Sequence, residues 1–517
     1  MTTSPLKSLF ATVFKVSLLS GLTAALSFGW NLLVASHLGV SGAADAFFVA
    51  STVPAVLISL CSSIGTALVP VFIPASRPVT DANNLYVTVF NAILLALLAV
   101  VVLGTLFAPT LVAAIGPGVD NATMQLATVL LRILLPTAFF SGLAALLTGM
   151  LNAHERFTYA ALSNLVRAAS TLGGMALLSA YGTVGMSVGW VLGGLIQLIV
   201  TVGVCRWQKV FWYRFRLDRR VPALGDAWTL ARTALLGMGA VQAVFTLERA
   251  FGSFLPVGTI SALSYATRTA RVGGGLVVQV VGQVSLPALA AKNAQESLDD
   301  AHCLFIRNLR LMVYLTFPLA AVLIGLSLPL STLLFQHGAI AETQVSRIAT
   351  LLSLASIGLF FFGLYELSLV CLYAWRRIKA ISLFYAILLG GFVMWGGLIG
   401  QYEAGKGLAL AYPLSLLMSA LYGLWALKIP RSYWATTMTY IARLAVVTLV
   451  TGISAFSVAT ILTPMLEALP AVARAGLILS AGLVSAGVVW VGMTAMLRIP
   501  ETLSGLQRVR VWVHFRL

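Results

Sequence analysis

Long apolar stretches alternate with short polar connections along the whole chain. A helix needs about 20 apolar residues to cross a bilayer, because it rises only about 1.5 Å per residue. The pattern predicts fourteen membrane spans, at roughly 8–36, 46–73, 84–108, 122–150, 158–180, 184–205, 228–254, 259–290, 303–331, 346–374, 380–400, 407–427, 436–463 and 473–497. We therefore expect an all-α membrane protein, since helices satisfy their own backbone hydrogen bonds in lipid.

The composition agrees with this class. Hydrophobic residues make up 60% of the 517 positions and charged residues only 9%, whereas soluble proteins carry about 25% charged residues. The apolar stretch after Lys7 is too long for a secretory signal peptide and lacks a small-residue cleavage site. It is expected to be an uncleaved first helix.

Basic residues fall on alternate connections, which sets the orientation. With the N-terminus inside, the outer connections contain only Lys406. The cytoplasmic parts contain Lys7, Lys15, Arg77, Arg156, Arg206, Lys209, Arg214, Arg216, Arg219, Arg220, Lys292, Arg376, Arg377, Lys379, Lys428, Arg431, Arg498, Arg508, Arg510 and Arg516. Both termini are therefore predicted to be cytoplasmic, and the net charge of +17 indicates attraction to anionic lipids rather than to nucleic acid.

The chain also repeats itself. The stretch LGVSGAADAFFVA from Leu38 aligns with LPVGTISALSYAT from Leu255, 217 residues later. Phe139 and Arg156 align with Phe360 and Arg377, 221 residues later. This spacing covers six spans, so the copies have the same orientation, and we expect two six-helix lobes related by a pseudo-two-fold axis along the membrane normal, plus two C-terminal helices.

These patterns give four predicted regions. Spans one to six form an N-terminal lobe at 1–205, and spans seven to twelve form a C-terminal lobe at 228–427. A basic cytoplasmic linker at 206–227 joins them, and 428–517 holds the last two spans and a basic cytoplasmic tail. The aromatic residues of the linker are typical of interface anchors, with a gating role as the alternative.

Ionisable residues inside spans are costly and mark candidate functional sites. Glu248 and Arg249 lie on the seventh span, and Arg268 and Arg271 on the eighth. Counting from a turn near Gly258 predicts that Glu248 and Arg268 lie at similar depth. Either Glu248 neutralises one arginine and the remaining guanidinium groups bind an anionic headgroup in a cavity, or the cluster is a structural ion-pair network.

Four further charged residues have competing interpretations. Glu366 is a candidate proton or cation site, or a hydrogen-bonded neutral acid. Asp45 is either an N-terminal helix cap or a second candidate cation site. Arg132 and Arg167 lie within spans and could extend their side chains to an interface.

Other chemistry is not expected. The four cysteines and five histidines are scattered, so neither disulfides nor a metal site are predicted. No phosphate-binding loop and no converging catalytic group is present in the sequence, so we expect a transporter without cofactor rather than an enzyme. The membrane potential or a cation gradient is the expected energy source.

Several segments resemble the MurJ/MviN family, the lipid II flippases of a superfamily that also contains multidrug and oligosaccharidyl-lipid exporters. They are ADAFFVA (44–50), LVPVF (68–72), GMLNAHERF (149–157), LERAFGSFLPVGTISALSYATR (247–268), SLPAL (285–289), LFQHGAI (334–340) and LYAWRRIK (372–379). The resemblance implies an inner-membrane flippase for a polyprenyl-diphosphate-linked saccharide, used in peptidoglycan synthesis and cell wall biogenesis or in polysaccharide export. It also matches Arg268 to a cavity arginine of the family, and Glu248 with Arg249 to an acidic-Arg pair.

The sequence departs from the family pattern in the first lobe. Ala24 and Trp30 stand where the family has arginines, and Ile58 and Ser59 replace basic residues of the second span. The substrate could thus be lipid II or another lipid-linked glycan, with a glycan polymerase or glycosyltransferase as a candidate partner. The alternatives are a cation-coupled multidrug exporter and a non-transporting scaffold in an envelope-synthesis complex.

The orientation can be tested with reporter fusions after Gly182, Ala339 and Ala404. All three positions fall in predicted outer connections, so we expect each fusion to report an outer location. A cytoplasmic signal from any one of them would break the fourteen-span topology.

Overall fold

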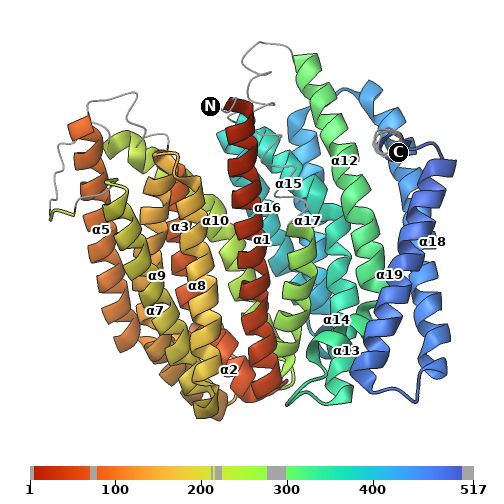
Figure 1. The fold of residues 1–517 in the computed structure, drawn as a ribbon, viewed down its shortest axis with the longest axis horizontal. Helices are drawn as coiled ribbons and strands as arrows, with labels where there is room; N and C mark the ends of the chain where they lie inside the picture. Colours follow the sequence, from red (N-terminus) through yellow and green to blue (C-terminus); the bar gives the residue numbers. More distant parts are fainter. Residues whose placement is uncertain are drawn as a thin grey trace. The chain divides into compact units, whose positions relative to one another are not determined.

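The computed structural model describes residues 5–69, 79–210, 213–215, 224–275, 298–375 and 377–503 (Figure 1). Several sequence predictions lie outside these residues: the end of the eighth span with its SLPAL segment, most of the basic linker, the tail from residue 504, and the basic residues Arg77, Lys292 and Arg376. The described part consists of helices and connections, without a strand. Twelve of its helical segments are long and apolar enough to cross a membrane.

The chain divides into two compact units, Met1–Ser261 and Ala262–Leu517. The first contains α1 (Pro5–Leu38), α2 (Gly42–Ala50), α3 (Thr52–Ala67), α5 (Val79–Leu106), α6 (Ala108–Ile115), α7 (Asn121–Ala153), α8 (Phe157–Leu177), η2 (Ser179–Tyr181), α9 (Gly182–Trp207) and α10 (Leu224–Gly252). A helical run at 259–275 leads into the second unit. That unit continues with α12 (Leu298–Gly325), α13 (Ser327–Phe335), α14 (Glu342–Ser356), α15 (Gly358–Ala374), α16 (Ile378–Ile399), η3 (Glu403–Gly405), α17 (Lys406–Leu427), α18 (Arg431–Met465) and α19 (Ala471–Met496).

Some predicted spans are interrupted where proline removes a backbone donor. Pro54 cannot donate to the carbonyl of residue 50, and α2 ends there before α3 begins. Pro329 acts in the same way at the junction of α12 and α13. At the junction of α5 and α6, Pro109 leaves the carbonyl of Thr105 without its helical donor, and Arg132 Nε donates to that oxygen at 3.3 Å. Arg132 therefore has a structural role.

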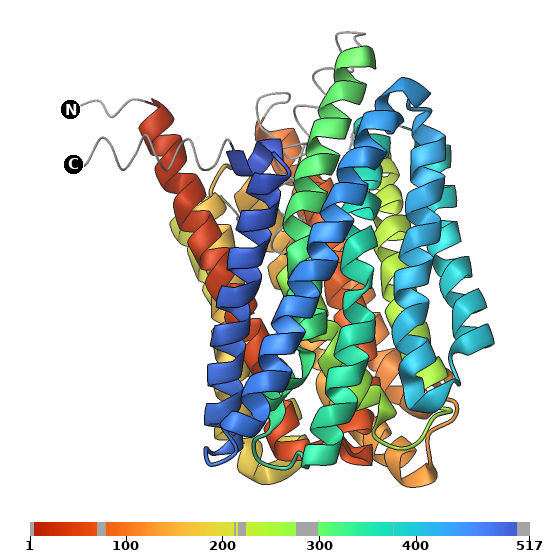
Figure 2. The ribbon, with the colours of Figure 1, turned by 90° about the vertical axis from the view of Figure 1, so that its right-hand side faces the viewer.

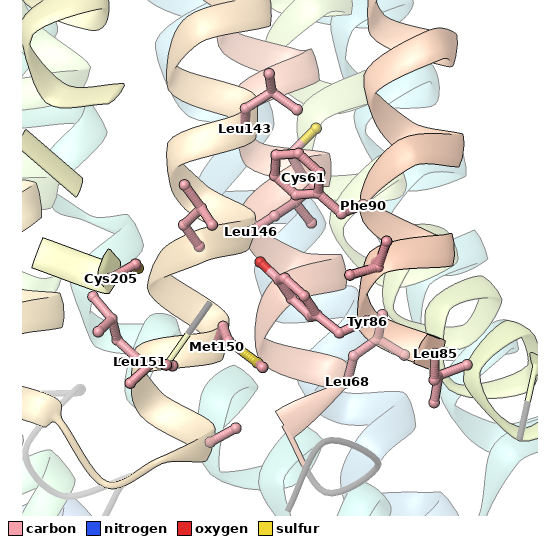
Figure 3. Close-up of a cluster of buried hydrophobic side chains, with 14 of the residues drawn as sticks. Cys61, Leu68, Leu85, Tyr86, Phe90, Leu143, Leu146, Met150, Leu151 and Cys205 are labelled. Atoms are coloured by element: carbon pink, nitrogen blue, oxygen red, sulfur yellow. The ribbon is translucent and has the colours of Figure 1, made fainter. Parts of the chain in front are cut away.

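The first unit has an apolar core among α3, α5 and α7. Figure 3 shows Cys61 of α3, Tyr86 and Phe90 of α5 and Leu146 of α7 packed together, with Cys205 at the end of α9 nearby. These side chains are at most 5% exposed. Their burial fixes α3, α5 and α7 as one body.

Aromatic side chains form a second core in this unit. Trp30 of α1 is 8% exposed, and its ring lies 4.8 Å from that of Trp190 on α9. Phe47 and Phe48 of α2 complete the group. Trp30, which stands where the family has an arginine, thus packs in an apolar cluster.

Glycines bring helix backbones into contact, which is a common way to associate helices in lipid. A Cβ on Gly174 of α8 would lie 2.6 Å from the carbonyl oxygen of Gly189 on α9. A Cβ on Gly149 of α7 would lie 2.5 Å from the carbonyl oxygen of Gly65 on α3. Helices α8 and α9 therefore run side by side along their length (Figure 1).

The seventh helix belongs to the first unit. The Gln242 amide of α10 donates to Ser59 Oγ of α3 at 2.9 Å, and Ser63 Oγ donates to the Ala234 carbonyl oxygen at 3.3 Å. Helix α10 starts at Leu224, inside the segment predicted as linker. The predicted lobe boundaries do not coincide with the two units, and the division into lobes stays a prediction.

In the second unit, the two C-terminal helices pack on α12 and α13. Figure 2 shows α18 and α19 side by side. Leu326 is buried against Ala455 of α18 and Ile478 of α19, and a Cβ on Gly482 would lie 2.6 Å from the Leu326 side chain. The appended pair is thus part of the second unit.

Adjacent glycines test the contact between α8 and α9. Gly174→Ala should destabilise the protein by about 1–3 kcal/mol, because the new methyl group overlaps the α9 backbone. Gly173→Ala is the matched control, since its Cβ would meet no atom within 4 Å and alanine favours the helix by about 1 kcal/mol. Thermal unfolding of the detergent-solubilised variants would measure both effects, and equal melting temperatures would contradict the close contact.

Candidate substrate-binding and gating residues

Asp45 of α2 binds the start of another helix. Its side chain is 4% exposed, and its two carboxylate oxygens accept hydrogen bonds from the backbone N–H groups of Gly258 at 2.6 Å and Ser261 at 2.7 Å. These groups open the helical run 259–275, where a negative charge is favourable. We call these two hydrogen bonds the Asp45 clamp.

The prediction that Asp45 caps the helix it starts is wrong. Ser41 is the N-cap of α2, because its Oγ accepts from the backbone N–H of Ala44 at 3.3 Å. This leaves the Asp45 carboxylate available for a helix more than 200 residues later in the sequence. A sequence pattern identifies a cap only from local spacing and cannot find a partner at that distance.

The turn before the run is closely packed. Gly258 has φ +87°, and a Cβ there would lie 2.6 Å from Val40, so the position requires glycine. The backbone N–H of Gly118 donates to Ser253 Oγ at 2.9 Å. A cavity of about 240 Å³ remains beside the clamp, and Asp45, Asp120 and Ser253 contribute to its lining.

Asp120 lies at the outer edge of this cavity and caps α7. Its Oδ2 accepts from the backbone N–H of Thr123 at 3.3 Å. Hydrogen bonds from the side chain and backbone of Thr123 hold the pKa of this carboxyl below its usual value. Asp120 is therefore an ionised cap at neutral pH.

Glu248 and Arg249 are adjacent on α10. Glu248 is 8% exposed, and Arg249 Nη1 donates to the Phe245 carbonyl oxygen at 3.5 Å. The turn after α10 occupies residues 253–258, so its centre lies before Gly258 and the equal count that placed Glu248 level with Arg268 does not hold. Their pairing stays a prediction, because they lie in different units.

In the second unit, Arg268 is half-buried on the helical run. Arg271, one turn later, donates through Nε to the Thr267 carbonyl oxygen at 3.1 Å and through Nη2 to Thr267 Oγ1 at 2.9 Å. Its guanidinium carbon lies 5.8 Å from the centre of the Tyr412 ring, a favourable position for a cation. Thr267 and Tyr412 hold this guanidinium in place.

Glu366 lies beside several tyrosines, which we call the tyrosine cluster: Tyr365, Tyr373, Tyr385 and Tyr412. The hydroxyl groups of Tyr373 and Tyr385 lie 3.5 Å apart. The charge of Glu366 acts on both Tyr365 and Tyr385. The cluster combines apolar rings with hydroxyl donors and acceptors next to a carboxyl group.

Analysis of the sequence found Glu366 but missed the tyrosines. They come from α15, α16 and α17, and tyrosine in a membrane protein usually indicates an interface anchor. The position of Tyr365 next to Glu366 was the available signal, whereas the approach of Tyr385 and Tyr412 depends on helix packing.

The chain is similar to lipid II flippases along most of its length. A family model described as "Lipid II flippase MurJ" matches residues 34–472. The chain is 27% identical over 398 residues to the "Probable lipid II flippase MurJ" of Buchnera aphidicola subsp. Baizongia pistaciae, covering 74% of this chain and 76% of the relative. It is 25% identical over 470 residues to the protein of the same description from Vibrio cholerae, covering 85% and 87%.

Solved structures show the same fold. A lipid II flippase MurJ in an inward closed conformation superposes with a TM-score of 0.80 and 21% identity, covering 93% of this chain and 98% of that one. An inward-facing multidrug transporter of the MATE family gives a TM-score of 0.65 and 13% identity, with 82% and 95% coverage.

The Asp45 clamp can be tested by hydrogen exchange. Asp45→Ala should leave two buried N–H groups without an acceptor, at about 1–3 kcal/mol for each. Amide exchange of the segment around Gly258 and Ser261 should then accelerate, while Asp45→Asn, which keeps one acceptor, should have a smaller effect. Asp120→Asn is the control in the same region, and unchanged exchange in Asp45→Ala would disprove the clamp.

Proposed function

Because the chain belongs to the lipid II flippase MurJ family, we propose that it moves a polyprenyl-diphosphate-linked saccharide, lipid II or a related precursor, from the inner to the outer leaflet of the bacterial cytoplasmic membrane. The family match across residues 34–472 is the observation that carries this proposal. The multidrug-exporter alternative is not favoured, since those transporters share the fold at only 13% identity. No observation favours a scaffold without transport.

The proposed architecture has fourteen spans in two six-helix lobes related by a pseudo-two-fold axis, with α18 and α19 added. Helix boundaries support the internal repeat. Helix α7 begins and ends 221 residues before α14 begins and α15 ends, and α8 begins 221 residues before α16. The helical run that starts at residue 259 follows the start of α2 by 217 residues, which is the offset found in the sequence.

Both termini and the basic connections are proposed to face the cytoplasm. The excess of lysine and arginine on one set of connections supports this orientation. Attraction to anionic lipid headgroups contributes about 1 kcal/mol for each basic residue near the surface. A glycan polymerase or glycosyltransferase is the proposed protein partner, because such enzymes use the exported saccharide.

The substrate diphosphate is proposed to bind Arg268 with Arg249 or Arg271, and Glu248 balances part of their charge. Guanidinium groups suit this role because their planar fork binds phosphate oxygens in pairs. The contacts of Arg271 with Thr267 and Tyr412 support a guanidinium held in a fixed position.

Alternating access requires one end of the transporter to open when the other closes. The Asp45 clamp supports a closed state at its end of the molecule, since it joins α2 to the helical run that carries Arg268. In the proposed cycle these two hydrogen bonds break as that end opens. A proton or cation at Glu366 or Asp45, or the membrane potential at about 2.3 kcal/mol for each charge and 100 mV, resets the empty carrier.

The role of Arg268 can be tested in cells depleted of their own lipid II flippase. Arg268→Ala should abolish translocation while the protein stays in the membrane. Arg268→Lys should restore only part of the activity, because lysine keeps the charge but not the two-pronged hydrogen bonding. Exposure of the lipid-linked glycan at the outer leaflet and protein abundance should be measured in the same membranes.

Glu248→Gln separates the two interpretations of the charged cluster. If the arginines bind substrate, this variant should remain partly active. If the cluster is a structural network, removing one partner of a buried pair costs about 3–5 kcal/mol and should lower abundance. Full activity in both Arg268 variants would show that Arg268 is not a substrate ligand.

A further inference from the structure

Arg167 lies at the centre of α8, in the first unit. The helix has 21 residues, and Arg167 is the eleventh from either end, so each end is about 15 Å away along the axis. An arginine side chain is too short to reach an interface from there, so the interpretation that Arg167 only extends to the membrane surface is wrong. Helix α8 is also absent from the twelve segments apolar enough to be recognised as spans, because of its polar residues.

The packing of α8 on α9 identifies the residue that faces Arg167. Ser163 and Thr201 hydrogen-bond at 2.5 Å across this seam. Two turns further along α8, Thr171 lies against Gly193, whose Cβ would come within 2.4 Å of Thr171 Oγ1. Four residues on from Ser163 is Arg167, and four residues back from Thr201 is Gln197. The antiparallel register therefore places Arg167 opposite Gln197.

Gln197 has an unused acceptor at this point. Its side chain is 2% exposed, and its Oε1 has no hydrogen-bond partner among the described residues. Leaving a buried acceptor unpaired is unfavourable. An unpaired amide oxygen opposite a guanidinium group is thus ready to accept a hydrogen bond from it.

The Arg167 side chain is also accessible. Ala160, Ala168 and Thr171 are buried on the same face of α8, yet Asn164, one turn from Arg167, is exposed. Arg167 itself is half-buried and forms no hydrogen bond or ion pair within the described ranges. This face therefore opens to solvent or ligand beside a guanidinium whose donors are not used.

We propose that Arg167 is an anion-binding residue of the first unit and takes the diphosphate of the transported lipid. One edge of the guanidinium group binds phosphate oxygens, while another N–H donates to Gln197 Oε1. Ligand binding then satisfies both groups at once, with Gln197 as the positioning residue. The inference rests on the proposed function for the identity of the ligand, but the phosphate contact is testable without translocation.

Thiol labelling beside the arginine provides that test. The four native cysteines, of which Cys303 is exposed and the other three are buried, are first replaced by alanine. A soluble thiol reagent should then label Asn164→Cys in the detergent-solubilised full chain. Undecaprenyl diphosphate should slow this labelling about tenfold, and in the added presence of Arg167→Gln by less than about twofold, because losing a charge-assisted contact weakens binding about ten- to a hundredfold.

Companion variants separate binding from folding. Arg132→Gln is the matched control, because Arg132 is also an arginine within a long helix of this unit but donates to a backbone carbonyl; protection should stay about tenfold. Arg167→Lys should keep part of the protection, and Gln197→Leu should reduce it while Arg167 remains charged. Melting temperatures confirm that each variant is folded.

The outcomes are distinct. Equal protection with and without Arg167, no protection in either protein, or no labelling of Asn164→Cys would each overturn the inference. If undecaprenyl diphosphate protects through Arg167 but the protein does not translocate lipid-linked saccharides, the proposed function fails and the anion site stands. If translocation occurs and Arg167→Gln is protected as well as its parent, the proposed function stands and the site fails.

Discussion

The contact of backbone against backbone between α8 and α9 is the constraint on which the first unit depends. In lipid, apolar side chains gain little by leaving one apolar surface for another, so helices associate through close approach and polar contacts. Gly174 and Gly189 allow that approach, and Ser163 with Thr201 adds a hydrogen bond across the same seam. The register set by these contacts brings Arg167 opposite Gln197, so packing and the proposed chemistry share one cause.

Much of the fold follows from the sequence because hydrophobic length is a strong signal in a membrane protein. Predicted spans such as 122–150 and 436–463 correspond to α7 and α18. The breaks within spans were not foreseen, although Pro54, Pro109 and Pro329 explain them once their backbone partners are known. Local sequence gave no means of seeing which carbonyl each proline would leave without a donor.

The candidate site was less accessible to sequence analysis. Arg271 and Glu366 stood out as charges in apolar surroundings, but their neighbours Tyr412 and Tyr385 come from other helices. Asp45 was assigned a local capping role because Ser41, its competitor for that role, lies only four residues away. Arg167 was set aside as an interface residue because its distance from the helix ends depends on where α8 begins and stops.

The Asp45 clamp has an evolutionary consequence. Its acceptor is a side chain, but both donors are backbone N–H groups of Gly258 and Ser261, which every residue except proline provides. The contact is therefore encoded on one side only. A change at position 45 has no complementary substitution at position 261 that could restore it, and pairwise covariation between these positions would be weak even where the contact is essential.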